Sequence, residues 1–151
     1  MTTQARHFDF THVRTLSAFI GTDQLKTMVE LSLGEEGEHY TDKLKEYAER
    51  VEAMPRVYEQ DGKGMEAIAY LHYFTGGCDW WITEADTEEP MIGFSDTPQP
   101  NRRLSEQLQT FGLADMGEPE LGYISIKEII ENGAELDLYW EPKTLRDALK
   151  K

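Results

Sequence analysis

Carboxylate side chains are the residues of this sequence that offer the most chemistry. Several of them converging at strand ends would bind a divalent cation or divide general acid and general base roles. His72 would add a nitrogen ligand to such a site. The carboxylates expected at strand ends or turns are Glu84, Asp86, Asp115, Glu118, Glu120, Glu135, Asp137 and Glu141.

No catalytic or metal-binding motif singles out one of these carboxylates. The chain has no H-E-x-x-H pair, EF-hand loop, glycine-rich phosphate loop or G-x-S-x-G turn. Cys78 is the only cysteine, which excludes an intramolecular disulfide and a cysteine zinc site. His72 lies between Leu71 and Tyr73 in an expected central strand, where a hydrogen-bonded structural histidine is the simpler interpretation. We therefore predict no catalytic residue, no metal and no cofactor.

Aromatic residues are the second set of candidates. Trp80 and Trp81 are adjacent, so in a strand their side chains point to opposite faces. At most one fills the main core, and the other lies in a second layer or is exposed. An exposed ring would serve as a ligand platform or partner anchor, with packing as the competing explanation. The candidate binding residues are Trp80, Trp81, Glu84, Asp86, Asp115, Glu118, Glu120, Tyr123 and Trp140.

The charge of the chain is strongly negative. It carries 29 acidic and 15 basic residues, a net charge of −14. Between Asp79 and Glu141 there are 15 acidic and three basic residues, which gives −12 for that segment. Such a field repels nucleic acid and anionic membranes and favours basic partners. Direct nucleic-acid binding is therefore disfavoured, although solubility alone also explains an acidic surplus.

The length and patterning predict one domain. A chain of 151 residues buries enough surface to fold without a disulfide or a metal. Residues 1–54 are expected to be helical and 55–151 sheet-rich, with a surface insertion at about 87–109. The first ten residues lack the apolar core of a signal peptide, and no apolar run approaches the roughly 20 residues that span a bilayer. These features predict a cytoplasmic protein without a membrane segment.

Apolar residues at helical spacing predict three helices near the N-terminus, over about 13–20, 23–33 and 41–54. Thr22 or Asp23 is expected to cap the second helix and Thr41 the third. Pro55 forbids continuation of the third helix.

The stretch Tyr70–Asp86 predicts a β-hairpin at the middle of a sheet, because two aromatic-rich runs flank Gly76-Gly77. A helical start over 65–69 competes with its beginning. Ser125 is expected to cap a short helix that ends near Gly133. Further strands are predicted over 56–60, 91–94, 111–116, 121–126 and 136–140, and a closing helix over 144–151. The pattern is typical of an α+β fold: N-terminal helices packed on a mainly antiparallel sheet of about four to six strands, with a short C-terminal helix.

The series DWWITEAD, FGLADMGEPELGYISIKEI and ELDLYWEPKTL resembles a bacterial family known as domain of unknown function 2958. The resemblance covers roughly residues 55–149. It lies on Trp80, Trp81, Thr83 and Glu84 in the first element, and on Glu120, Gly122, Tyr123, Ser125 and Glu128 in the second. The second, separated tryptophan of the first family motif is missing here, and the excursion between the motifs is long. The resemblance implies a small intracellular protein of plasmids, phages and integrated mobile elements.

These observations favour a non-enzymatic acidic interaction protein, a mobile-element accessory or anti-defence factor that binds a basic protein surface. An acidic face that imitates the phosphate spacing of DNA would occupy the basic groove of a nuclease. The alternative is a ligand- or metal-dependent enzyme that uses strand-end carboxylates beside the aromatic hairpin. A third hypothesis is a homodimer formed through an edge strand near Met91 or Trp140.

Overall fold

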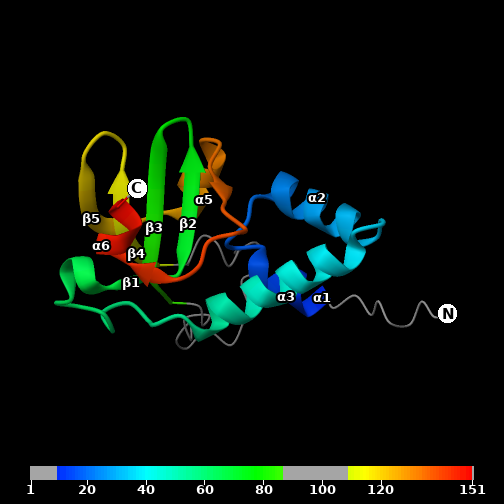
Figure 1. Ribbon diagram of the computed structural model, residues 1–151, viewed down its shortest axis with the longest axis horizontal. Coiled ribbons are helices and arrows are strands. Elements are labelled where there is room, and N and C mark those ends of the chain that lie inside the picture. The colour runs from blue at the N-terminus through cyan, green and yellow to red at the C-terminus, as the bar shows by residue number, and fades with distance from the viewer. Residues whose placement is uncertain (1–9, 87–108, 151) are drawn as a thin grey trace, which may run out of the picture.

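The computed structural model describes residues 10–86 and 109–150, which form a group of helices packed against a twisted antiparallel sheet (Figure 1). This arrangement confirms the predicted α+β fold. The expected strand at 91–94 and nearly all of the insertion at 87–109 lie outside the described residues. Within those residues, no helix has the length and apolar character needed to cross a bilayer.

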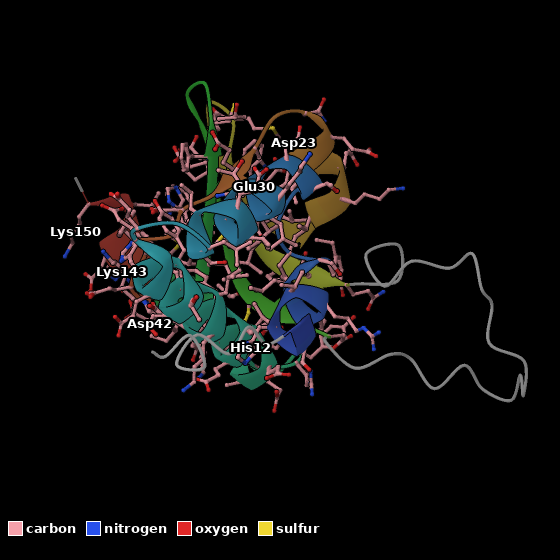
Figure 2. The ribbon with its side chains drawn as sticks, turned by 90° about the vertical axis from the view of Figure 1, so that its right-hand side faces the viewer. His12, Asp23, Glu30, Asp42, Lys143 and Lys150 are labelled. Carbon is pink, nitrogen blue, oxygen red and sulfur yellow. The ribbon has the colours of Figure 1, made fainter. Side chains whose placement is uncertain are left out.

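Three helices precede the sheet: α1 (Phe10–Leu16), α2 (Thr22–Ser32) and α3 (Gly37–Ala53). The expected caps are wrong. Gly21 occupies the N-cap of α2 without a side-chain cap, and α3 begins four residues before Thr41. Glu38 in the first turn of α3 suits the positive end of the helix dipole. The acidic turn before this helix is closed by a hydrogen bond that Gly37 N donates to Gly34 O (3.1 Å). Acidic residues of these helices lie exposed on their outer side, among them Asp23, Glu30 and Asp42 (Figure 2).

Five strands form the main sheet in the order β5-β4-β3-β2-β6. They are β2 (Leu71–Thr75), β3 (Cys78–Ala85), β4 (Thr110–Asp115), β5 (Pro119–Ile124) and β6 (Glu135–Leu136). Gly76 and Gly77 both have positive φ, 53° and 127°, and close the β2–β3 turn. The predicted hairpin is therefore confirmed, and β3 is the central strand.

Smaller elements complete the fold. A short 3-10 helix, η2 (Gly64–Glu66), leads into β1 (Ile68–Ala69), which pairs with β7 (Lys143–Thr144). The helix α5 (Ile126–Glu131) is capped by Ser125, whose hydroxyl accepts from Glu128 N at 3.1 Å, as predicted. The closing helix α6 (Leu145–Leu149) is capped by Thr144 in the same way.

Two predicted strands are wrong. Residues 57–60 form turns instead of a strand, because Tyr58 has a φ of 80° and the backbone folds around acidic side chains of the sheet. The last strand ends at Leu136, because the carboxylate of Asp137 accepts from Tyr139 N at 2.9 Å and so bends the chain into a turn.

The sheet separates two hydrophobic clusters. Its inner face packs on the helices and supplies Leu71, Tyr73, Trp80 and Ile82 to the main core. Its outer face supports a smaller cluster made of Ala67, Ala69, Trp81, Leu113 and Leu145. Trp80 and Trp81 thus lie on opposite faces, and both are buried (6% and 3% exposed). Neither tryptophan offers a free ring to a partner.

Candidate functional site

The outer face of the sheet, opposite the helices, carries most of the candidate side chains. The register places His72, Trp81, Leu113 and Leu121 in one row across the four strands from β2 to β5. Residues two positions along each strand share that face. The residues of the outer face are His72, Phe74, Asp79, Trp81, Phe111, Leu113, Asp115, Leu121 and Tyr123.

A β-bulge between Ile82 and Glu84 turns the Glu84 side chain toward this face, opposite Phe111. Gly112 permits the close approach of β3 and β4 here, because a Cβ at Gly112 would lie 1.9 Å from Trp81 O. The bulge therefore places a carboxylate at a position that strict alternation along the strand would not predict.

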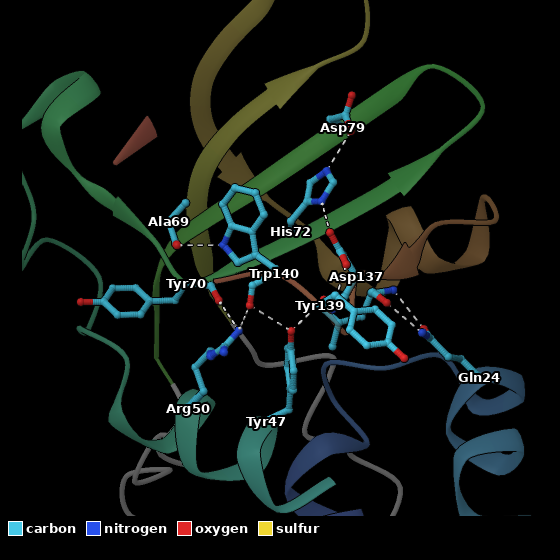
Figure 3. Close-up of polar contacts among 11 residues, drawn as sticks. Gln24, Tyr47, Arg50, Ala69, Tyr70, His72, Asp79, Asp137, Tyr139 and Trp140 are labelled. Carbon is cyan, nitrogen blue, oxygen red and sulfur yellow. Dashed lines mark hydrogen bonds and ion pairs between the residues drawn. The ribbon is translucent and has the colours of Figure 1, made fainter. Parts of the chain in front are cut away.

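His72 bridges two carboxylates. Its Nε2 lies 2.8 Å from Asp79 Oδ1, and its Nδ1 lies 3.0 Å from Asp137 Oδ2 (Figure 3). Both contacts are hydrogen bonds only if the three groups share two protons. The ring is stacked on Trp81, with centroids 5.4 Å apart, and Trp140 lies 5.2 Å away at a tilt. The expected hydrogen bonding of this histidine is confirmed, since both of its nitrogens are engaged.

Helix α3 holds the segment after β6 against the sheet. Tyr47 donates its hydroxyl to Asp137 O at 2.9 Å, and Arg50 Nη1 donates to Trp140 O at 2.9 Å (Figure 3). Burial raises the pKa of Tyr47, although Arg50 opposes the change. The indole of Trp140 donates to Ala69 O at 3.0 Å. Trp140 is therefore a fixed part of the packing rather than a free platform.

The predicted carboxylates Glu84 and Asp86 hold the loop that precedes the 3-10 helix. Glu84 is only 4% exposed, and its two oxygens accept from Tyr58 N at 3.0 Å and Gln60 N at 2.6 Å. Asp86 Oδ1 accepts from Val57 N at 3.1 Å. The loop backbone thus forms a concave set of N–H donors around carboxylates of its own chain.

A hollow of about 330 Å³ lies between this loop and strands β3 to β5. Phe111, Leu121 and Leu145 contribute apolar walls, while Tyr58 and Glu84 add polar atoms. The lining therefore combines one buried carboxylate with apolar and aromatic side chains.

Two tyrosines meet at the rim of the hollow. The hydroxyls of Tyr58 and Tyr123 lie 2.6 Å apart, and both side chains are exposed. Tyr123 packs edge-on against Phe111, with ring centroids 5.5 Å apart at 87°. The hydrogen bond with Tyr58 is the main cause that raises the pKa of Tyr123. Tyr58, Phe111 and Tyr123 therefore form a continuous aromatic group, which we call the aromatic rim.

Three more of the predicted acids lie at the other end of strands β3 to β5, whereas Glu135 belongs to β6 and Glu141 follows Trp140. Asp115, Glu118 and Glu120 surround the β4–β5 turn, where Asp115 Oδ1 accepts from Gly117 N at 3.1 Å. Asp115 pairs with Asp79, whereas Glu84 pairs with Phe111, so the structure separates these acids from Glu84 and Asp86. Within residues 10–86 and 109–150, no group of three or more acidic, histidine or cysteine side chains is arranged to hold a metal.

Sequence patterns missed Tyr58, Phe111 and Leu121 as site residues. Because the pattern of residues 56–60 predicts a strand, it does not indicate the loop that carries Tyr58. The alternation of Phe111 with Gly112 and of Leu121 with Gly122 was the available signal, because it puts the large residues of neighbouring strands on one face.

No family model matches this chain, and no curated protein or solved structure matches it either. Its function is therefore inferred from its own surface.

Proposed function

We propose that this protein is a non-enzymatic interaction protein that binds a basic segment of another protein along strand β5. The observation that carries the proposal is the unpaired outer side of this edge strand. No strand in the described ranges pairs with its outer side, and Leu121 (43% exposed) and Tyr123 (58% exposed) stand on it beside Glu118 and Glu120.

An edge strand presents backbone N–H and C=O groups that an extended segment can pair with. The partner segment would lie beside β5 as an added strand, and its apolar side chains would cover Leu121 and Tyr123. Met116 in the preceding turn is also exposed and enlarges the apolar surface. Apolar residues surrounded by polar ones are typical of a protein-binding patch.

Charge selects the kind of partner. The acidic residues Asp115, Glu118 and Glu120 lie around the β4–β5 turn, next to the start of β5, in the segment that holds −12 of the net charge. A negative surface accelerates encounter with a basic segment and disfavours acidic competitors. The resemblance to proteins of mobile elements supports a partner that itself binds nucleic acid through a basic surface, which this protein would occupy competitively.

The alternative of an enzyme that uses strand-end carboxylates has less support. The two nitrogens of His72, the one histidine expected near such a site, already have partners within the chain. A reacting group needs at least one position open to a substrate.

The test follows amide resonances during titration with a short peptide of alternating lysine and valine. We expect shifts concentrated on residues 119–124, and their loss in the double variant Leu121→Lys, Tyr123→Lys, which places positive charge on the strand. Leu33→Lys is the matched control, because Leu33 is 73% exposed on the helical side of the molecule.

A peptide with glutamate in place of lysine should not bind. The proposal fails if the lysine peptide shifts residues of α3 as much as those of β5, because that result would indicate attraction by net charge alone. It also fails if the double variant binds the peptide as well as the Leu33→Lys control does.

A further inference from the structure

We propose that the hollow beneath the aromatic rim binds an alkylammonium group, as carried by the side chain of lysine and its methylated forms. The inference rests on the proposed function, since the lysine would belong to the basic segment that lies along β5. The hollow would then recognise one side chain of that segment, in addition to the open edge of β5 and the acidic residues beside it.

Aromatic rings supply the first argument. Phe111 and Tyr58 line the hollow, and Tyr123 touches both of them at the rim. Ring faces attract a cation through their quadrupole, and ammonium groups with several carbon substituents are recognised by sets of such rings. Phe111 supplies one ring inside the hollow, and the perpendicular ring of Tyr123 lies beside it at the rim, so that the two ring faces have different orientations.

A buried negative charge supplies the second argument. Glu84 lines the hollow, and its two carboxylate oxygens accept hydrogen bonds from neutral backbone N–H groups, those of Tyr58 and Gln60. Among the residues that the structure describes, no lysine, arginine or histidine forms an ion pair with it. Burial of a carboxylate without a cation is unfavourable. A ligand ammonium group in the hollow would provide the missing countercharge.

Two further carboxylates reinforce this field. Asp61 also lines the hollow. Asp86 accepts from the backbone of Val57, another residue of the lining, at 3.1 Å, and the negative charges of Glu84 and Asp86 contribute to the raised pKa of Tyr123 after its hydrogen bond, its desolvation and the charge of Tyr58. The surroundings of the hollow therefore favour a positive ligand over a neutral or negative one.

The backbone of Tyr58 supplies a third argument. Its φ of 80° is a conformation that residues with large side chains rarely adopt. The contacts from Tyr58 N to Glu84 and from its hydroxyl to Tyr123 hold it there. Strained residues concentrate at binding sites, where the surrounding structure fixes a side chain in a useful position. Here the strained residue keeps an aromatic ring at the mouth of the hollow.

The size of the hollow limits the ligand. A volume of about 330 Å³ is near the lower end of small-ligand sites, which span roughly 300–1,000 Å³. It suits one side-chain head group rather than a nucleotide or a larger cofactor.

The experiment compares choline with 3,3-dimethylbutan-1-ol, its neutral isostere, in which a carbon atom replaces the charged nitrogen. Choline should give saturable shifts of the aromatic resonances of Tyr58, Phe111 and Tyr123, with an affinity about tenfold higher than that of the alcohol. Equal affinities, or choline shifts that do not saturate, would overturn the proposal.

Two variants locate the site. Phe111→Leu keeps an apolar wall but removes a ring, and Asp61→Asn removes one exposed charge. We expect the first to weaken choline binding about tenfold and the second severalfold. Asp42→Asn, on the exposed side of α3, is the control and should bind choline like the parent protein. Melting temperatures close to that of the parent would show that each variant is folded.

The results separate the two proposals. If choline does not bind while the lysine–valine peptide still shifts β5, only the ammonium site is wrong. If choline binds while the peptide does not, the hollow is a cation site and the proposed docking along β5 is wrong.

Discussion

Gln24 and Leu136 exchange two hydrogen bonds across 112 positions of sequence. Gln24 Nε2 donates to Leu136 O at 2.8 Å, and its Oε1 accepts from Leu136 N at 2.9 Å. A side-chain amide carries the same donor and acceptor pair as a peptide group. The Gln24 side chain of helix α2 thus bonds to the outer edge of β6 as one residue of a neighbouring strand would. Gln60 pairs with Ile68 in the same manner, at 3.0 and 2.8 Å.

Replacing Gln24 with Glu removes the donor and leaves two acceptors facing each other. We expect a loss of about 1–3 kcal/mol in the free energy of unfolding. Chemical denaturation of Gln24→Glu checks this value, and amide exchange of Leu136 should become faster. Asp23→Asn, one residue earlier and exposed, should leave both unchanged. An unaltered Leu136 exchange rate would show that the edge does not depend on Gln24.

Replacing Glu84 with Gln introduces a donor into a set of backbone donors. One amide group of Tyr58 or Gln60 then loses its acceptor in a buried place, which we expect to cost about 1–3 kcal/mol of stability. Hydrogen exchange should accelerate at these two amides before it changes in β3. Glu118→Gln, on the exposed turn, is the matched control. Equal stability of the two variants would contradict the role given to Glu84.

Replacing His72 with Asn shortens the bridge between Asp79 and Asp137 and leaves at least one half-buried carboxylate without its donor. We expect about 2–4 kcal/mol of destabilisation, chiefly from the unpaired carboxylates and the lost stacking on Trp81. His39→Asn is the control, since His39 is exposed and has one long hydrogen bond, 3.3 Å, to the exposed Tyr139, besides ring contacts with Tyr40 and Tyr139. Thermal melting of the two variants makes the comparison. A similar effect of both would mean that the bridge adds little.

Alkaline pH should unfold this protein through its buried tyrosines. Burial raises the pKa of Tyr73 well above the ordinary value of 10.0, and that of Tyr47 is raised for the same main reason. The folded state therefore keeps these protons more strongly than the unfolded state, and stability is full below pH 10 and falls as the pH rises beyond it. Denaturation at a series of pH values from 8 to 12 measures the slope.

Tyr73→Phe removes one titrating group, so its stability should fall less steeply above pH 10, even though it loses the hydrogen bond from Tyr73 to Phe19 O (2.5 Å) at every pH. Tyr139→Phe, at an exposed site, should keep the parent slope. Identical slopes for the parent and Tyr73→Phe would contradict this account.

Local sequence patterns were sufficient to predict the elements whose structure depends on neighbouring residues. The apolar spacing around Leu25 and Leu44 predicted α2 and α3, and Gly76-Gly77 predicted the central hairpin. The opposite faces of Trp80 and Trp81 follow from strand geometry alone. The expected Ser125 cap is likewise a matter of neighbouring residues.

The loop of the candidate site could not be predicted in this way. Tyr58 adopts its unusual φ because a carboxylate 26 positions later accepts its N–H. The bulge that turns Glu84 outward depends on the pairing of β3 with Gly112. The pairing of β1 with β7 joins Ile68 to Thr144, 76 positions apart, and neither two-residue strand has a pattern of its own. Each of these features is determined by tertiary contacts that propensity does not encode.

The unequal edges of the sheet bear on assembly. Gln24 occupies the β6 side of the main sheet at Leu136 while β5 offers its backbone, so among the described residues added strands can extend the main sheet from one direction only. Two copies that met β5 to β5 would use up each other's single open edge and form a closed pair with two-fold symmetry. A third copy would then find no open edge on the main sheet as described, so growth into fibrils by repeated pairing of β5 would stop at the dimer.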